Sequence, residues 1–489
     1  MLFNSHIFML LFLPLLLAGW YFLNWKKKFQ LAQGYLIGMS LWFYAYANLQ
    51  YLWLLLFSCL IGWLLSCVPE KISSEKGKKV LTGVGCVFHL GLLGYFKYSN
   101  FFLENLNTVF HTDFPMLQIL LPVGISFYTF QQLAYLIDRC RGDAPRDSFF
   151  DYLTFMVYFP QLLQGPILLR SEFMGQLKEP ERRRFHAERF SEGIQFFVFG
   201  LAKKVLLADT LAKAVNYGYS NVSMLDSISA LLLAVGYLTE LYFDFSGYCD
   251  MAVGLGKMIG LEVAENFDAP FHSASVKEFW RRWHMTLGRF FTRYVYIPLG
   301  GNRKGKMGTL CNVMIVMLLS GLWHGAAWTF VLWGFLHGVG MIWDNLEHPH
   351  LPKKWMRQAA TFAYVCMTFV FFRAESIAQG VDVLKSIVSL KWNGFVFQMA
   401  SALDLTEFYM ITKALSMKLP GLLSWFWLGI FVVLIAICFR VLSGEKVSGV
   451  VALQRQKGYG RLYPVLLAVL FTWSMISMTG VSEYLYFSF

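Results

Sequence analysis

The stretch that decides the fold class is residues 309–343, TLCNVMIVMLLSGLWHGAAWTFVLWGFLHGVGMIW, in which no Asp, Glu, Lys or Arg occurs. A helix needs about 20 consecutive apolar residues to cross a bilayer. The stretch holds two apolar halves on either side of Gly321–Gly325. It therefore predicts two membrane helices that are separated by a short break.

The composition of the whole chain points to the same class. Of its 489 residues, 57% are hydrophobic and only 15% are charged, whereas soluble domains carry roughly 25% charged residues. A disordered chain and a soluble enzyme are both excluded by this composition. The net charge of +12 fits cytoplasmic loops, which collect Lys and Arg in membrane proteins. We therefore expect membrane lipids as partners and no nucleic acid.

The first apolar run, Ile7–Leu23, is followed by Lys26, Lys27 and Lys28. A signal peptide would have its positive charges before the apolar run. We therefore expect a retained helix with an extracytoplasmic N-terminus and the three lysines in the cytoplasm.

Apolar runs continue along the chain and predict about eleven membrane spans. A helical hairpin is predicted by Leu31–Tyr46 and Tyr51–Val68, which are split at Asn48–Gln50. One long span, either tilted or broken at Asp244–Gly247, is predicted by Ile228–Ile259. Residues 374–422 predict short interfacial helices. The expected fold is an all-α, polytopic integral membrane protein with a single domain over residues 1–489. The further spans are Val80–Lys97, Pro115–Ile137, Gln195–Val215, Trp355–Phe372, Leu423–Phe439 and Tyr463–Ser477.

Residues 149–169 break the alternation of basic loops, because Arg and Lys follow them where an outer loop is expected. They also contain Pro160 and Pro166, which interrupt helical hydrogen bonding. Non-helical backbone at membrane depth is tolerated only inside protein or beside a wet cavity. We interpret the segment as re-entrant. The alternative is an ordinary kinked span.

Ionisable side chains within membrane segments indicate function by default, and they gather at three places. The first holds Glu240, Asp244 and Asp250. Glu240 and Asp244 are four residues apart and would share one helix face. These carboxylates either act in chemistry or have a structural role, for example by pairing with arginines.

The second place is the most basic stretch of the chain, Lys277–Lys306. Read as a helix, it has His284 with Trp280 on an aromatic face and Arg289 on a basic one, as in an interfacial amphipathic helix. A histidine on an apolar face is either a buried packing residue or a catalytic one. The arginines could anchor lipid headgroups or bind an anionic donor.

The third place surrounds His324, which lies more than ten residues from the nearest charge. Small residues crowd it, including Ser320, Gly321 and Gly325, and Trp323 and Trp328 flank it. Small residues allow a helix or a ligand to approach closely. A neutral imidazole in such a place could act as a general base, or it could pack between helices. His337 reads as a packing residue.

These motifs resemble the membrane-bound O-acyltransferase (MBOAT) family, and within it the bacterial alginate O-acetyltransferase branch. The resemblance rests on FWRRWH at 279–284, YIPLGGNR at 296–303, GLWHGAAW at 321–328, DFSGY at 244–248, FFRAE at 371–375 and the opening MLFNS. These motifs occur in order along nearly the whole chain.

The resemblance implies a ring of tilted helices around a central tunnel, with the donor arriving from the cytoplasm and the acceptor from the other side. It implies that His324 is the catalytic histidine and that His284 takes the second motif position, as an orienting or oxyanion-stabilising partner. The residues expected along the tunnel or substrate path are Trp280, Trp323, Trp328, Asp244, Tyr248, Arg289, Tyr296 and Asn302. No metal and no cofactor are expected beyond an acyl thioester donor such as acetyl-CoA.

The leading function hypothesis is therefore an acetyltransferase subunit that passes acetyl groups to extracytoplasmic partner proteins for exopolysaccharide O-acetylation, with alginate first and cellulose second. Two alternatives stay open. One is another acyl transfer of the same family, to teichoic acid, a lipid or a protein. The other is a transporter with His324 in a proton relay, which the missing internal repeat disfavours.

Overall fold

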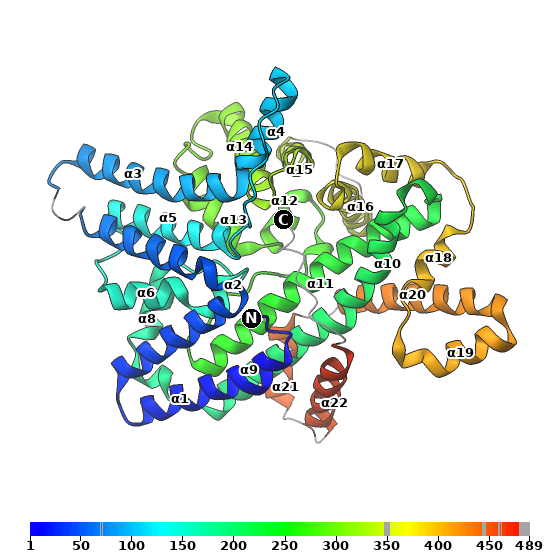
Figure 1. Cartoon of the computed structure of the whole chain (residues 1–489), viewed down its shortest axis with the longest axis horizontal. Coiled ribbons are helices and arrows are strands. Elements are labelled where there is room, and N and C mark those ends of the chain that lie inside the picture. The colour runs from blue at the N-terminus through cyan, green and yellow to red at the C-terminus, as the bar shows by residue number, and fades with distance from the viewer. Residues whose placement is uncertain are drawn as a thin grey trace. The chain divides into compact units, whose positions relative to one another are not determined.

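A computed structural model describes residues 1–68, 70, 72–346, 353–442, 446–457, 460 and 462–478. Within these ranges the regular elements are all helices, and no β-strand is present (Figure 1). The predicted all-α class is confirmed. The chain groups into two compact units, the first formed by Met1–Val198, Tyr248–Glu265 and Thr286–Pro298, and the second by Phe199–Gly247, Asn266–Met285 and Leu299–Phe489. Three helices, α9, α11 and α13, continue from one unit into the other.

The first unit begins with a π-helical turn, Phe8–Phe12, that leads into α1. Its helices are α1 (Leu13–Trp25), α2 (Phe29–Cys67), α3 (Glu75–Leu93), α4 (Ser99–Phe110), α5 (Ile125–Arg141), α6 (Phe149–Val157), α7 (Phe159–Leu162), α8 (Arg170–Leu177) and most of α9 (Ala187–Ala202). Here α1 packs along α2, and α3 packs against α5.

The second unit contains α10 (Asp209–Ser220), most of α11 (Ser227–Ile259), α12 (Val276–Arg282) and the first residue of α13 (Met285–Phe291). It continues with α14 (Gly305–His324), α15 (Trp328–Asn345), α16 (Lys354–Arg373), α17 (Ile377–Val388), α18 (Phe395–Ser401), α19 (Tyr409–Lys418), α20 (Pro420–Leu442), α21 (Val447–Lys457) and α22 (Leu462–Ser477). The predicted short helices within residues 374–422 are present as α17, α18 and α19.

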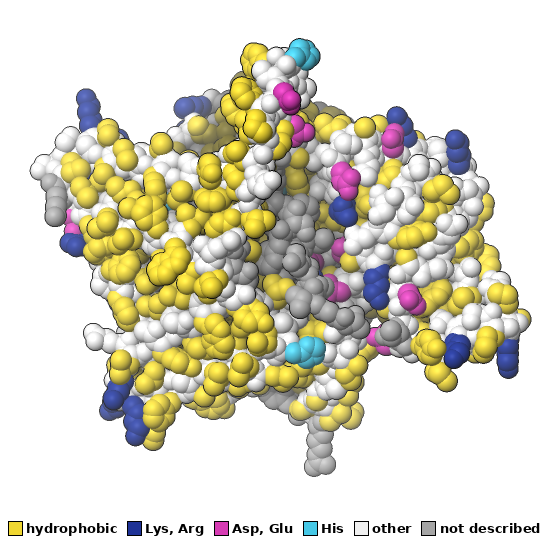
Figure 2. All heavy atoms as spheres, viewed as in Figure 1, with side chains coloured by type: hydrophobic (Ala, Val, Ile, Leu, Met, Phe, Trp, Pro, Cys, Tyr) yellow, Lys and Arg dark blue, Asp and Glu magenta, His cyan; other side chains and the backbone are white. Residues whose placement is uncertain are grey.

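Six helices among the described residues are long and apolar enough to cross a membrane. They are Phe8–Trp25, Leu49–Cys67, Glu75–Phe110, Ser227–Ile259, Gly305–His324 and Pro420–Phe439, and the shorter Leu462–Ser477 is also apolar. Large hydrophobic side chains are exposed on several of them, and Trp53 on α2 is 73% exposed. Figure 2 shows a broad hydrophobic surface over α2 and α3. Such surface suits contact with lipid tails rather than water.

The break that was predicted between residues 321 and 325 is confirmed, one turn later than its first glycine. Helix α14 ends at His324, and α15 starts at Trp328. The two helices then pack along each other. They approach closely because each helix has a glycine at the contact, Gly321 on α14 and Gly334 on α15. A Cβ on Gly321 would collide with the carbonyl oxygen of Phe330 and would lie only 3.3 Å from the Gly334 Cα.

A helix break is absent at two places where the sequence suggested one, and the hairpin prediction at the first of them is wrong. The predicted hairpin at Asn48–Gln50 is absent, because α2 runs continuously over Phe29–Cys67. Asn and Gln keep the backbone N–H that proline lacks, so they do not force a break. Helix α11 likewise continues through Asp244–Gly247. Gly247 serves close packing there, since a Cβ would lie 2.7 Å from the Gly200 carbonyl oxygen.

Residues 149–169 form a broken and buried segment, as their prolines predict. Helix α6 ends at Val157, and the short α7 carries Pro160. After α7 ends, the backbone is not helical from Leu163 to Leu169. The two ends of the segment meet. Arg170 Nε donates to Asp147 Oδ2 at 2.7 Å, and a second bond joins the same guanidinium to Oδ1. Because the chain leaves and returns to one ion pair, this geometry supports the re-entrant interpretation.

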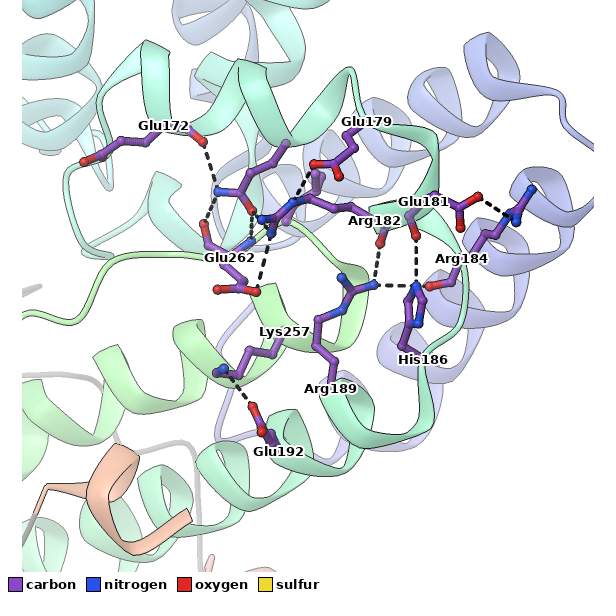
Figure 3. Close-up of polar contacts among 12 residues, drawn as sticks. Glu172, Glu179, Glu181, Arg182, Arg184, His186, Arg189, Glu192, Lys257 and Glu262 are labelled. Atoms are coloured by element: carbon purple, nitrogen blue, oxygen red, sulfur yellow. Dashed lines mark hydrogen bonds and ion pairs between the residues drawn. The ribbon is translucent and has the colours of Figure 1, made fainter. Parts of the chain in front are cut away.

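The charged loop after this segment is held by ion pairs (Figure 3). Arg182 pairs with Glu179 at 2.9 Å and with Glu262 at 3.5 Å, while Lys257 pairs with Glu192 at 3.0 Å. Lys257 lies in the last turn of α11, and Glu262 follows the end of that helix. The pairs of Arg182 therefore attach the loop between α8 and α9 to the segment after α11, and the pair of Lys257 attaches α9 to α11, all within the first unit.

Candidate functional site

His324 is the last residue of α14, and its side chain is buried in the second unit. Its ring lies 4.9 Å from the ring of Trp323, 5.1 Å from that of Trp333 and 5.2 Å from that of Phe372, measured between centroids. All three rings meet it at steep angles. The histidine thus stands where α14 stops, with the aromatic rings of α15 and α16 around it.

His284 lies at a second break, which sequence analysis missed. The expected continuous helix with Trp280 and His284 on one face is wrong, because α12 ends at Arg282 and α13 begins at Met285. His284 has a φ of +45°, a left-handed conformation that is uncommon for a residue with a Cβ. Its side chain is fully buried. Burial lowers the pKa of His284 to about 3, so the imidazole is neutral at pH 7.

The two histidines come from segments 40 residues apart in the sequence and meet in the second unit. Their ring centroids are 6.4 Å apart, and the Trp323 ring packs against both, 6.0 Å from His284 and 4.9 Å from His324. From α11, Phe245 packs against the His284 ring at 4.8 Å. The structure therefore brings together His284, His324 and Trp323, three of the residues that sequence analysis singled out.

Two buried polar atoms belong to the same surroundings. Ser320 lies one turn before His324 on α14, and Trp333 touches the His324 ring from α15. Within the described part of the chain, Ser320 Oγ and Trp333 Nε1 have no hydrogen-bond partner. A buried donor left in this state costs free energy unless a ligand or water satisfies it. Both atoms could donate to an oxygen that carries negative charge.

Trp280 reaches this region through His337. Its indole Nε1 donates to His337 Nδ1 at 3.2 Å, and the second ring nitrogen, Nε2, lies 2.9 Å from Thr368 Oγ1. Because Nδ1 accepts, the proton of a neutral ring must be on Nε2, which donates to Thr368. Both nitrogens of His337 are thus used within the protein. This arrangement supports the packing role that the sequence indicated.

Asp244 is an ion-pair partner within the second unit. Lys204 Nζ lies 2.6 Å from Asp244 Oδ1 and 2.8 Å from Asp209 Oδ1. The Lys204 and Asp244 side chains are both only 2% exposed. Of the two readings that the sequence left open, the contacts favour the structural one. Sequence analysis missed Lys204, although a lysine inside an apolar stretch is a recognisable signal.

Three predicted site residues belong to the first unit. Tyr248 is buried there and stacks on Phe3 with a centroid distance of 4.7 Å. Arg289 donates to both carboxylate oxygens of Glu172 and to the Ile167 carbonyl. Tyr296 ends a π-helical turn and is half-buried.

Two further predicted residues lie at exposed positions of the second unit. Trp328 is 57% exposed at the start of α15, and Asn302 is exposed in the turn before α14. The basic stretch around them is less free than its composition suggests. Arg282 pairs with Glu278, and Arg293 pairs with Asp138 and Asp143. The stretch keeps exposed positive side chains at Arg281, Arg303, Lys304 and Lys306.

No group of three or more His, Cys, Asp or Glu side chains that could hold a metal ion occurs in the described ranges. The side chains near His324 offer imidazole nitrogens and hydrogen-bond donors, which can accept a proton and stabilise an oxyanion.

Comparison with known proteins agrees with this chemistry. Residues 141–379, which include both histidines, match the model of MBOAT, the membrane-bound O-acyltransferase family. A peptidoglycan O-acetyltransferase of Helicobacter pylori is 35% identical over 423 residues, covering 80% of each chain. The chain belongs to the membrane-bound O-acyltransferase family. It is an O-acyltransferase and a multi-pass membrane protein.

Other members are similar over much of the chain. A probable alginate O-acetylase of Pseudomonas putida is 39% identical over 392 residues, which cover 77% of this chain and 78% of that one. A teichoic acid D-alanyltransferase of Bacillus subtilis is 28% identical over 272 residues, which cover 52% of this chain and 69% of that one. The family resemblance that the motifs carried is confirmed.

Proposed function

We propose that this membrane-bound O-acyltransferase transfers an acetyl group from cytoplasmic acetyl-CoA, through the membrane, to an extracytoplasmic acceptor hydroxyl, and that the group is used for O-acetylation of a glycan. The observation that carries the proposal is the meeting of His284 and His324 at two helix ends in the second unit, with ring centroids 6.4 Å apart. The similar O-acetyltransferases support acetyl as the transferred group.

In the proposed reaction, His324 is the general base. It takes the proton of the acceptor hydroxyl while the oxygen attacks the thioester carbonyl. The C–O bond forms, the C–S bond breaks, and the proton passes from His324 to the leaving thiolate. The intermediate oxyanion needs hydrogen-bond donors. We assign that role to Trp333 Nε1 and Ser320 Oγ, which are buried next to His324 and have no hydrogen-bond partner among the described residues.

The donor is an anionic thioester, and the exposed basic side chains of the 277–306 stretch suit its attraction. Arg281, Arg303, Lys304 and Lys306 are the exposed members. Arg282 and Arg293 are engaged with carboxylates and contribute to structure instead. Trp323 packs against both histidines, and Trp280 packs against Trp333. We place these two tryptophans along the substrate path, together with Trp328 and Asn302 of the same unit.

The membrane arrangement follows from the same proposal. We infer about eleven spans around a central tunnel in one domain of a bacterial inner membrane, with the N-terminus outside. Extracytoplasmic acetyl-acceptor proteins would receive the group and modify the polymer. No cofactor is required beyond the donor.

Two acceptor polymers are favoured by specific observations. The 39% identity to a probable alginate O-acetylase supports an exopolysaccharide such as alginate. The 80% coverage of a peptidoglycan O-acetyltransferase supports cell-wall glycan. In both cases the polymer is finally modified at a sugar hydroxyl, so one transfer reaction across the membrane serves both.

The test is a sided transfer assay. The purified protein is placed in vesicles with radiolabelled acetyl-CoA on one side and alginate oligomers or peptidoglycan fragments on the other, with the partner proteins of the native gene cluster. Label on an oligosaccharide across the membrane is expected, and the labelled polymer identifies the acceptor. Transfer of a D-alanyl group instead, or ion flux without acetyl transfer, would overturn the proposal.

A further inference from the structure

The backbone at His284 is held in a costly conformation by its neighbours. A φ of +45° places it in the left-handed region, which costs about 1–2 kcal/mol for a residue with a Cβ. Such strain persists only where surrounding contacts impose it, and it is often found at functional sites. The question is which residue imposes the conformation of His284.

Asn266 contacts both the side chain and the backbone of this turn. Its side-chain oxygen Oδ1 lies 3.2 Å from His284 Nδ1. Its backbone oxygen accepts a hydrogen bond of 2.9 Å from the N–H of Met285. Asn266 is only 1% exposed. A single buried residue therefore fixes the ring and the peptide that follows it.

The next residues extend this attachment along the turn. The backbone N–H of Asp268 donates to the Arg282 carbonyl at 2.9 Å, and Arg282 Nη1 reaches back to the Asp268 carbonyl at 3.4 Å. Residues 266–268 thus run beside the turn between α12 and α13 and contact it on both sides of His284. All of these residues lie in the second unit.

The bond to Asn266 determines where the proton of a neutral His284 ring resides. An amide oxygen can only accept, so His284 Nδ1 must donate. In the neutral imidazole the other nitrogen, Nε2, then carries a lone pair and no proton. His284 in this form can accept at Nε2 but cannot donate there. Hence it does not suit the oxyanion-donor role that the family resemblance implied for it.

We propose that Asn266 is a positioning residue for the reaction: it holds His284 as the Nδ1–H tautomer, so that Nε2 presents a hydrogen-bond acceptor next to His324. The arrangement corresponds to the general pattern in which a base is oriented by a third polar group. The acceptor would stabilise the imidazolium that forms when His324 takes the hydroxyl proton. This inference rests on the proposed function, because it assumes that His324 reacts.

The surroundings of His284 support a role for Asn266 in particular. From α11 the ring meets the uncharged Phe245, and from α14 it meets Trp323 and His324. His324 is thus a titratable side chain in ring contact with His284, and Asn266 is a neutral group that orients the His284 ring.

Two variants at Asn266 and a control at Asn24 test the inference. Asn266→Ala removes the acceptor, and we expect kcat for acetyl transfer to fall about 10- to 100-fold, with KM for acetyl-CoA changed less than threefold. Asn266→Asp keeps an acceptor oxygen and adds a charge that favours imidazolium. It should recover most of kcat and move the acidic limb of the pH–rate profile to higher pH. Asn24→Ala, another buried asparagine whose amide donates to the Trp20 carbonyl, should leave kcat unchanged.

A second readout separates this inference from the proposed function. In protein with ¹⁵N-labelled histidine, the His284 signals are identified by their loss in His284→Asn. They should show the Nδ1–H tautomer in the wild type and a mixture in Asn266→Ala. An unchanged tautomer in Asn266→Ala would overturn the positioning role even if activity fell. A changed tautomer with full transfer activity would show that Asn266 orients a ring outside the reaction, which contradicts the assignment of His284 to the site.

Discussion

The imidazole rings of His284 and His324 lie 6.4 Å apart with 56° between their planes, although His284 lies in the break between α12 and α13 and His324 is the last residue of α14. Catalytic histidines at helix ends have an advantage, because the backbone there can present a side chain without a continuing helix in the way. Both ring positions depend on structural features that can be changed one at a time. The following predictions use those features.

The close approach of α14 and α15 should be essential for placing His324. Gly321→Ala would put a methyl group against the Phe330 carbonyl, and such overpacking costs about 1–3 kcal/mol. We expect a lower thermal midpoint and reduced transfer. Gly83→Ala in α3 is the matched control, since nothing lies within 4 Å of its added Cβ. It should be neutral or slightly stabilising. Equal behaviour of the two variants would contradict this packing role.

The ion pair that joins the two ends of residues 149–169 should be structurally important. In Asp147→Asn the guanidinium of Arg170, whose side chain is only 12% exposed, loses its carboxylate. Leaving a buried charge unpaired costs about 3–5 kcal/mol, so the thermal midpoint in detergent should drop by several degrees. Glu75→Gln removes the exposed pair with Lys78 and should have almost no effect. A small effect of Asp147→Asn would mean that the segment is held by its packing alone.

Asp244 should be dispensable once its partner is removed with it. Lys204→Met alone leaves Asp244 buried without its cation, and we expect poor accumulation of the protein. The double variant Lys204→Met/Asp244→Leu replaces the pair by apolar groups and should recover folding and most acetyl transfer. A folded double variant with no activity would instead give Asp244 a direct part in the reaction.

The buried His284 should make the protein sensitive to acid. Its pKa is lowered by burial to about 3 in the folded state, against about 6.5 in an unfolded chain. Below pH 6.5 His284 therefore binds a proton in the unfolded state but stays unprotonated in the folded state. Stability is then lost as the pH falls, by about 1.4 kcal/mol per pH unit for this one residue.

His284→Asn removes the pH-dependent loss of stability that His284 causes, and asparagine is a residue type that tolerates positive φ. The difference in thermal midpoint between wild type and variant should hence shift in favour of the variant between pH 7 and pH 5. The other histidines contribute equally to both proteins and cancel. Parallel curves over this range would show that His284 is not the source of acid sensitivity.

Several features were predictable from sequence because they depend on local chemistry. The apolar halves around Gly321–Gly325 and the prolines of residues 149–169 each gave a break that the structure contains. Long-range relations were not predictable. Nothing near Asn266 in the sequence indicates its bond to a histidine 18 residues away, and the left-handed turn at His284 lies in a stretch whose periodicity reads as a continuous helix. Glycines were misread at Gly247, where close packing rather than a helix break requires them.

The most direct test of the account measures the single-turnover rate of acetyl transfer by His324→Ala in vesicles, with insertion and folding verified by the thermal midpoint. Removing a general base typically costs 10²–10⁴-fold in rate. The account predicts a fall of at least about 100-fold at saturating acetyl-CoA, with donor affinity unchanged. His89→Gln, which alters a buried histidine bonded to Ser58 in the first unit, should retain the wild-type rate. A His324→Ala variant that transfers acetyl groups within threefold of the wild-type rate would contradict the claim that His324 is the base.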